Sequence, residues 1–247
     1  MSMKSIIFIH GNASSSKVFE PIIKNWQLPV NLIALDLPGH GNSEKKTNYS
    51  WNSNKSSLLD DINKIEGDKL LLGNSLGGFY AVELAQKVKS LKGVVLMGST
   101  PLKKPINFNE AFVPNPYVGA YLKNSPDKEE IHEAAYAAVE NKSIVPLLIE
   151  DFYKTETKAR TVLVDCLANP DVFLDQAKIF SLLRCSKYII TGKKDPIINF
   201  DYLKKLQKEA VHPIKLLEIK NCGHYPSIEK PKEFAKILEK ISDEVFQ

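Results

Sequence analysis

The stretch that most limits what this chain can fold into is residues 73–77, which read GNSLG. It follows the apolar run 70–72 and leads into a helix-compatible stretch, so Ser75 is expected on a sharp turn between a strand and a helix. Glycines on either side let neighbouring backbone approach closely and leave the hydroxyl projecting. The helix N-terminus would also direct N–H groups toward negative charge that forms nearby. The pattern therefore predicts a nucleophile at Ser75.

Another interpretation of this stretch stays open from these residues alone. A strand, a glycine-rich turn and a helix occur in many parallel α/β proteins without chemistry at the turn. A phosphate-binding loop is disfavoured, because no Lys-Ser or Lys-Thr pair follows the glycines and no G-x-G-x-x-G pattern is present. The rest of the chain has to decide between a structural turn and a nucleophile.

Strand-like and helix-like segments alternate through most of the chain. The run 6–9 is continuously apolar, as expected of a strand buried on both faces. The alternation predicts an α/β fold with a mostly parallel sheet of about six strands and helices on both faces. The expected strands are 4–9, 31–36, 70–72, 93–98, 187–191 and 214–219. The expected helices that accompany them include 18–26, 53–65, 199–209 and 231–241.

The alternation is interrupted between about residues 101 and 183, where no convincing buried strand occurs. Helical stretches are expected there instead, at 127–140, 143–154, 157–168 and 171–183. Open α/β sheets bind ligands outside the carboxyl ends of their strands, so an inserted helical block would act as a cap over the site. We therefore expect a core formed by 1–100 and 184–247 and a cap formed by 101–183.

Two loops that follow predicted strands supply partners for Ser75. Asp195 lies in TGKKDP after one strand, and His224 lies in CGHYP after the next. Because the carboxyl ends of parallel strands share one edge of a sheet, both are expected beside Ser75. Each alone has an ordinary explanation as a turn or loop residue. Three such residues at three strand ends, in the chain order Ser, Asp, His, favour a catalytic triad.

An attack by Ser75 on a carbonyl also needs N–H donors for the oxyanion. The backbone N–H groups of Leu76, directly after the nucleophile, and of Asn12, in the turn after the first strand, are the candidates. The side chain of Asn12 would be a further donor or part of the turn. No catalytic metal is predicted, because no two histidines stand at metal-ligand spacing with a carboxylate. Structural or surface roles are expected for His10, His40, His132 and His212.

The composition is that of an ordinary globular protein. The 247 residues, 43% hydrophobic and 25% charged, can bury a substantial core. The net charge of +4 is spread along the chain, so no nucleic-acid partner is expected. Three cysteines without C-x-x-C spacing indicate a reducing compartment. No signal peptide or membrane-spanning segment is evident, so we expect a cytoplasmic monomer or homodimer without membrane association.

With these segments assembled, the chain resembles the α/β-hydrolase superfamily over nearly its whole length. The motifs are specific for the superfamily but not for a substrate, since the same framework serves many reactions. The first strand starts almost at residue 1, so the sheet resembles the superfamily's with its N-terminal hairpin trimmed away. The segments that carry the resemblance are HGN at 10–12, DLPGHGNS at 36–43, GNSLGG at 73–78, GKKDP at 192–196 and GH at 223–224.

The resemblance implies that the cap supplies walls of a pocket for a small-molecule acyl substrate, and that no cofactor is needed. Aromatic residues at helical spacing are usually core, so only a minority of the cap's aromatic residues are expected to contact substrate. The candidates for substrate contacts are Phe112, Tyr117, Tyr121 and Phe152.

The predicted function is a serine hydrolase that cleaves a small-to-medium carboxylic ester through an acyl-enzyme. Haloalkane dehalogenases and epoxide hydrolases of the superfamily are excluded, because they carry an aspartate where this chain has Ser75.

Three alternatives stay open. A carbon–carbon bond hydrolase of a dienone acid would use the same triad but needs a cation for the substrate carboxylate, from Arg184 or a cap lysine. The superfamily's menaquinone-pathway lyase resembles the chain in size. It uses an arginine shortly after the nucleophile, however, where this chain has Phe79, and only Arg160 and Arg184 occur. A hydrolase-fold ligand sensor with little turnover is the third alternative.

Overall fold

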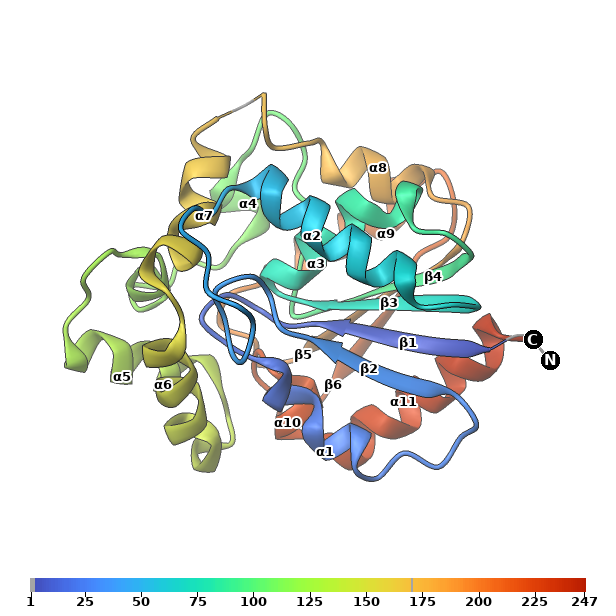
Figure 1. Cartoon of the computed structure of the whole chain (residues 1–247), viewed down its shortest axis with the longest axis horizontal. Helices are drawn as coiled ribbons and strands as arrows, with labels where there is room; N and C mark the ends of the chain where they lie inside the picture. Colours follow the sequence, from blue (N-terminus) through green and yellow to red (C-terminus); the bar gives the residue numbers. More distant parts are fainter. Residues whose placement is uncertain (1–2, 170) are drawn as a thin grey trace.

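The computed structural model describes residues 3–169 and 171–247. Its centre is a sheet of six parallel strands in the order β2-β1-β3-β4-β5-β6 (Figure 1). Ile7 of the first strand lies opposite Leu71 of the third. The predicted parallel sheet is therefore confirmed. The strands are β1 (Lys4–Ile9), β2 (Asn31–Leu35), β3 (Asp68–Asn74), β4 (Leu91–Met97), β5 (Ser186–Gly192) and β6 (Lys215–Ile219).

Helices cover both faces of the sheet, which explains the continuous apolar run in β1. Ile7 and Ile9 pack against one layer and Ile6 and Phe8 against the other, and all four are fully buried. On one face lie α2 (Trp51–Lys64), α3 (Leu76–Leu84), η2 (Ala85–Lys87), α8 (Gln176–Leu182) and α9 (Phe200–Glu209). On the other face lie η1 (Ser16–Phe19), α1 (Glu20–Ile23), α10 (Pro226–Glu229) and α11 (Pro231–Val245) (Figure 1).

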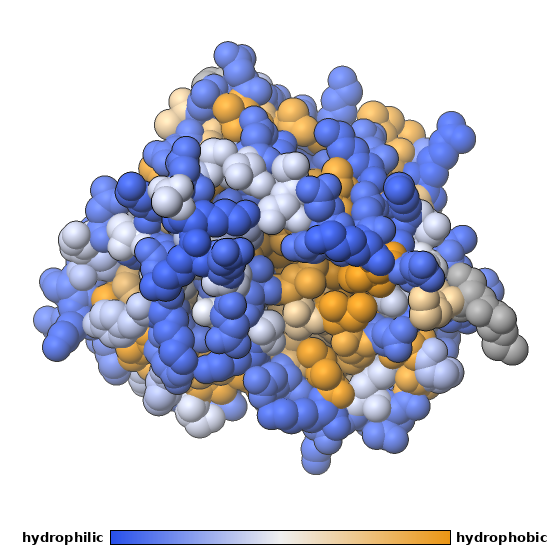
Figure 2. Space-filling view, viewed as in Figure 1, coloured by the Kyte–Doolittle hydropathy of each residue, from blue (hydrophilic) through white to orange (hydrophobic). Residues whose placement is uncertain are grey.

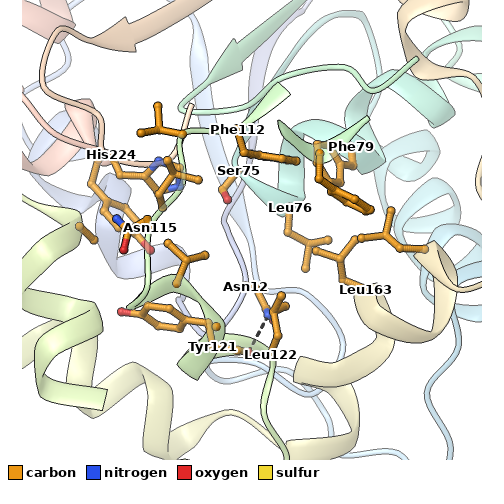
Figure 3. Close-up of a pocket in the computed structure, with 18 residues that line it drawn as sticks. Asn12, Ser75, Leu76, Phe79, Phe112, Asn115, Tyr121, Leu122, Leu163 and His224 are labelled. Atoms are coloured by element: carbon orange, nitrogen blue, oxygen red, sulfur yellow. Dashed lines mark hydrogen bonds between the residues drawn. The ribbon is translucent and has the colours of Figure 1, made fainter. Parts of the chain in front are cut away.

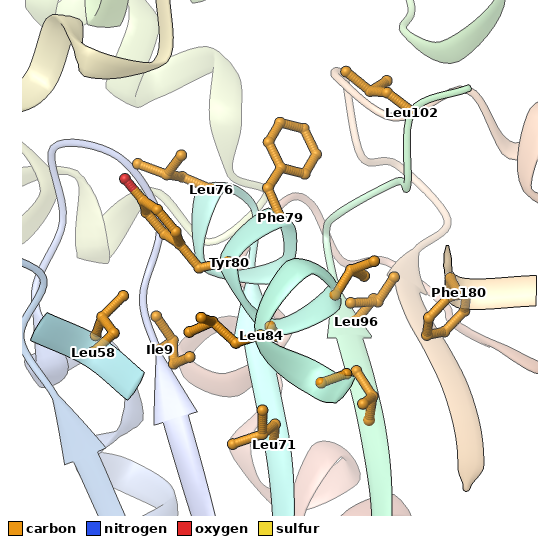
Figure 4. Packing of buried hydrophobic residues seen from close by; sticks show 14 of the residues in the cluster. Ile9, Leu58, Leu71, Leu76, Phe79, Tyr80, Leu84, Leu96, Leu102 and Phe180 are labelled. Atoms are coloured by element: carbon orange, nitrogen blue, oxygen red, sulfur yellow. The ribbon is translucent and has the colours of Figure 1, made fainter. Parts of the chain in front are cut away.

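Helix α3 is the most deeply buried helix of the first layer. Figure 4 shows Leu76, Tyr80 and Leu84 of this helix among side chains of the sheet, of α2 and of α8. All nine residues of α3 are buried, so the helix is enclosed on every side. This packing fixes the start of α3, which directly follows Ser75.

A second group of helices lies beside the carboxyl ends of the strands (Figure 1). The short elements α4 and η3 were not predicted, because four or five residues are too few for a periodic pattern. Helix α8 belongs to the stretch 101–183 that we predicted as cap, yet it packs against α3 and α9 over the sheet. The group comprises α4 (Phe108–Ala111), η3 (Val118–Leu122), α5 (Lys128–Ala138), η4 (Lys142–Ile144), α6 (Val145–Lys154) and α7 (Thr157–Leu167).

Strand β2 forms one edge of the sheet. Figure 2 shows hydrophobic side chains gathered over β1 and β2 on this face, and residues 32–35 are half-buried.

No helix within residues 3–169 or 171–247 is both long and apolar enough to cross a lipid bilayer.

Candidate active site

The turn that carries Ser75 is strained and closely packed. Ser75 has φ 49° and ψ −117°, a left-handed conformation that costs free energy in a residue with a side chain. A Cβ atom on Gly73 would lie 2.3 Å from the carbonyl oxygen of Gly77, and one on Gly77 would lie 2.1 Å from that of Ile9. The hydroxyl of Ser99 donates to the carbonyl of Ser75 at 2.8 Å. Only glycine at both flanking positions allows this turn.

Asp195 and His224 form a buried pair. Nδ1 of His224 lies 2.9 Å from Oδ2 of Asp195, and both side chains are almost completely shielded from solvent. The other carboxylate oxygen of Asp195 accepts from the backbone N–H groups of Ile197 at 2.9 Å and Ile198 at 3.2 Å. Held in this way, the carboxylate keeps the imidazole proton on Nδ1 and leaves Nε2 as a proton acceptor.

The histidine loop lies directly against the Ser75 turn. The side-chain amide of Asn74, next to Ser75, donates to the carbonyls of Met97 at 2.9 Å and His224 at 3.3 Å. Figure 3 shows Ser75 with His224 on one side and Leu76 on the other. The structure therefore brings together the three residues that the sequence predicted as a triad.

Glu229 holds the histidine loop from behind, and the sequence analysis did not find it. Its buried carboxylate accepts from the N–H groups of Gly223 and Tyr225, on either side of His224, each at 3.0 Å. It also accepts from the backbone N–H of Glu140 at 2.7 Å, just after the end of α5. A carboxylate in a helix first turn is a weak sequence signal of this role, because such groups accept backbone N–H bonds.

The two predicted oxyanion donors lie next to the turn. Leu76 is the first residue of α3, so its N–H has no partner within the helix. A Cβ atom on Gly11 would lie 3.1 Å from the Cβ atom of Ser75, so the turn containing Asn12 lies against Ser75. The side chain of Asn12 instead reaches the cap, donating to the carbonyls of Tyr121 at 3.2 Å and Arg160 at 3.0 Å. Its amide is thus engaged in a cap contact.

His10 and His40 are buried below this turn and are held neutral. Nε2 of His10 accepts from the N–H of Leu37 at 2.9 Å, and Nδ1 donates to Gly11 at 2.7 Å. Burial lowers the pKa of His10 to about 4 and that of His40 to about 3. Their contacts are those of structural residues.

A cavity of about 320 Å³ opens above Ser75 (Figure 3). Among the lining residues that the structure describes, none is Lys, Arg, Asp or Glu. The walls are mainly aliphatic and aromatic, as in most small-molecule sites. The cavity is lined by Asn12, Ser75, Leu76, Phe79, Phe108, Phe112, Val113, Asn115, Val118, Gly119, Tyr121, Leu122, Ala138, Leu163, Leu167, Ile197, His224 and Tyr225.

The four aromatic residues predicted to contact substrate divide into two pairs. Phe112 and Tyr121 line the cavity, whereas Tyr117 and Phe152 do not. Tyr117 is 43% exposed on the outside. Phe152 is buried behind Tyr121, with ring centroids 5.8 Å apart.

Both arginines point away from the cavity. Arg160 donates to the carbonyl of Lys123 at 2.8 Å, and its guanidinium lies 4.2 Å from the ring centre of Phe152. Arg184 precedes β5, at the opposite end of the sheet from Ser75, in a surface pocket with Lys187. Neither residue is placed to bind an anion beside Ser75.

Comparison with known proteins places the chain in a family. The chain matches the alpha/beta hydrolase family over residues 6–237. A putative 2-succinyl-6-hydroxy-2,4-cyclohexadiene-1-carboxylate synthase of Haemophilus influenzae is 25% identical over 253 residues, covering 96% of each chain. Lipase 3 of a Moraxella species is 24% identical, covering 96% of this chain and 77% of that one.

A solved structure extends this similarity to the fold. The N-acyl homoserine lactonase AidH, complexed with N-butanoyl homoserine, superposes with a TM-score of 0.86 at 21% identity, covering 99% of this chain and 90% of that chain. The family match spans most of the sequence, from the first strand to the last helix. The chain therefore belongs to the alpha/beta hydrolase family.

Proposed function

We propose that this protein is a serine hydrolase that cleaves small-to-medium, uncharged carboxylic esters. The observation that carries the proposal is the buried Asp195–His224 pair beside Ser75, at the floor of an apolar cavity. A serine hydroxyl is a weak nucleophile by itself, and an adjacent imidazole that a carboxylate orients is the arrangement that activates it.

The proposed reaction proceeds through an acyl-enzyme. Nε2 of His224 takes the hydroxyl proton as Ser75 Oγ attacks the ester carbonyl carbon, and Asp195 stabilises the imidazolium. The N–H groups of Leu76 and Asn12 stabilise the negative charge that develops on the carbonyl oxygen. His224 then gives its proton to the departing alcohol. A water molecule that His224 deprotonates releases the acid and restores Ser75.

The lining of the cavity supports uncharged substrates, and its size sets how much of a substrate is enclosed. At ~30 Å³ for each water-sized group, the cavity holds about ten or eleven non-hydrogen atoms. His224 is the only described lining residue with a basic side chain, and its partner Asp195 lies behind it. A permanently charged substrate would lose its hydration there without gaining an ion pair.

The uncharged lining of the cavity also disfavours carbon–carbon hydrolysis of a carboxylate substrate. The similarity to a putative 2-succinyl-6-hydroxy-2,4-cyclohexadiene-1-carboxylate synthase over 96% of both chains makes an activity on a carboxylate substrate the second candidate. Such a substrate needs a cation in the pocket, but Arg160 is bonded to the backbone at Lys123 and position 79 is Phe. The lining therefore favours an ester.

A time course of p-nitrophenyl ester hydrolysis, from acetate to decanoate, tests the proposal. Wild type should turn over repeatedly, and Ser75→Ala should lower kcat by about 10⁴-fold or more. Ser53→Ala, an exposed serine on α2, is the matched control and should keep full activity. Full activity in Ser75→Ala would end the proposal. A single stoichiometric burst in wild type would instead favour a ligand sensor with little turnover.

A further inference from the structure

The cavity runs from a buried floor to a mouth in one segment of the cap. At the floor, Leu76, His224 and Tyr225 are almost completely buried. Among the lining residues within 3–169 and 171–247, only some in 108–119 are exposed: Phe108 at 48%, Val113 at 41%, and Gly119. A ligand bound at Ser75 therefore meets solvent at this segment.

An apolar surface continues from the floor through the mouth. Phe112 lines the cavity and is half-buried, and its ring stacks beside that of Phe108, with centroids 6.2 Å apart and planes 21° from parallel. The ring of Phe108 extends this surface outward to solvent. Exposed apolar side chains that adjoin a binding cavity are typical of ligand-binding grooves.

The mouth is a fixed part of the fold. The N–H of Val113 donates to the carbonyl of Ile197 at 2.8 Å, and that of Asn199 donates to Ala111 at 3.1 Å. These bonds tie the mouth to the loop that carries Asp195. Phe108 and Val113 are thus held beside the path to Ser75 by the backbone that positions the acid.

We infer that the substrates carry an apolar chain longer than the cavity, and that Phe108 and Val113 bind the part of the chain that emerges. This inference rests on the proposed esterase function and names its substrate class. A methyl octanoate molecule, with about eleven non-hydrogen atoms, fills the cavity. Longer chains must leave through the mouth. Its uncharged walls and the exposed ring of Phe108 favour contact with methylene groups and offer no partner to a charged group.

The test measures kcat/KM by titrating released acid for two ester series below their micelle concentrations. Methyl esters from butyrate to dodecanoate lengthen the acyl side, and alkyl acetates from butyl to dodecyl lengthen the alcohol side. The variants are Phe108→Ser and Val113→Ser. Leu182→Ser is the control, because Leu182 is 45% exposed at the end of α8 and does not line the cavity.

In wild type, kcat/KM should keep rising beyond the octanoate length in one series, which identifies the side that leaves through the mouth. A fully buried methylene gives about a fourfold gain, so four methylenes at a half-exposed mouth should give about fifteenfold. Phe108→Ser should remove this gain, so that kcat/KM for the longest ester relative to methyl butyrate falls by the same factor. Val113→Ser should act in the same direction, and Leu182→Ser should match wild type.

Two results would overturn the inference. A wild-type optimum at or below the octanoate length in both series, or an equal effect of Phe108→Ser on every chain length, removes the role of the mouth. Hydrolysis of methyl butyrate that still depends on Ser75 would then leave the proposed function standing. If no ester in either series is hydrolysed in a Ser75-dependent way, the proposed function fails and the inference fails with it.

Discussion

The proposed catalytic residues and the walls of the cavity are held in different ways. Ser75, Asp195 and His224 stand just beyond the ends of β3, β5 and β6, and backbone N–H groups or glycine packing fix each of them. Most of the walls come from the segment 108–122 and from α7, which contribute side chains but no catalytic group. The sheet thus positions the chemistry and the cap shapes the space, so substitutions in the two regions should have separable effects.

The largest difference between substitutions in the two regions is expected in kcat. Asp195→Asn should lower kcat by about 10⁴-fold with little change in KM, because the amide no longer holds the imidazole in the productive tautomer. Leu163→Ala, in the wall from α7, should raise KM by about tenfold with kcat nearly unchanged. Steady-state kinetics on one ester measures both. A large kcat loss in Leu163→Ala would show that the two regions are not separable.

The free energy of unfolding should show the same difference between the two regions, tested at one glycine in each. A Cβ on Gly77 would lie 2.1 Å from the carbonyl of Ile9, so Gly77→Ala should lower the free energy of unfolding by about 3 kcal/mol or more. A Cβ atom on Gly119, in the cap, would have no neighbouring atom within 4 Å. Gly119→Ala should therefore change the free energy of unfolding by no more than about 0.5 kcal/mol. Urea unfolding measures both values. Equal losses would contradict the packing described for the Ser75 turn.

Acid should weaken the junction between the two regions, where His10 and His40 are buried. Their pKa values, about 4 and about 3 in the folded protein, lie below the ordinary 6.5, so the unfolded chain binds more protons as the pH falls below 6.5. Stability should therefore decrease as the pH falls, by about 2 kcal/mol for each histidine at pH 5. Urea unfolding at pH 7, 6 and 5 measures this slope. His40→Gln should flatten it, and an unchanged slope would count against a neutral buried His40.

The smallest expected effect is a loss of kcat on changing Glu229, with a second buried carboxylate, Glu83, as the control. Glu229→Gln should lower kcat by about ten- to a hundredfold with KM within twofold, because the amide cannot accept from every N–H around His224. Glu83 is the matched control, since it accepts from Trp51 at 2.9 Å and Lys55 at 2.8 Å, away from His224. Glu83→Gln should lose stability but keep kcat. Parallel losses of activity and melting temperature in both variants would mean that Glu229 acts only through folding.

The sequence could predict the residues that sit in local motifs and could not predict contacts between distant segments. Ser75 is recognisable because its glycines, strand and helix are all within ten residues of it. Glu229 also accepts from the backbone just after α5, a contact that depends on how the cap docks. Phe112 and Phe152 are the same residue type on neighbouring parts of the cap, yet only Phe112 faces the cavity. Helix packing decides that difference, and periodicity carries no information on it.

Covalent labelling tests the central claim that Ser75 is the activated nucleophile. An alkyl fluorophosphonate reacts with an activated serine, and peptide mass spectrometry locates the modified residue. We predict one label per chain, on Ser75, with complete loss of ester hydrolysis and much slower labelling in Asp195→Asn. Ester hydrolysis that persists in a fully labelled protein, or a label on any other serine, would contradict the account.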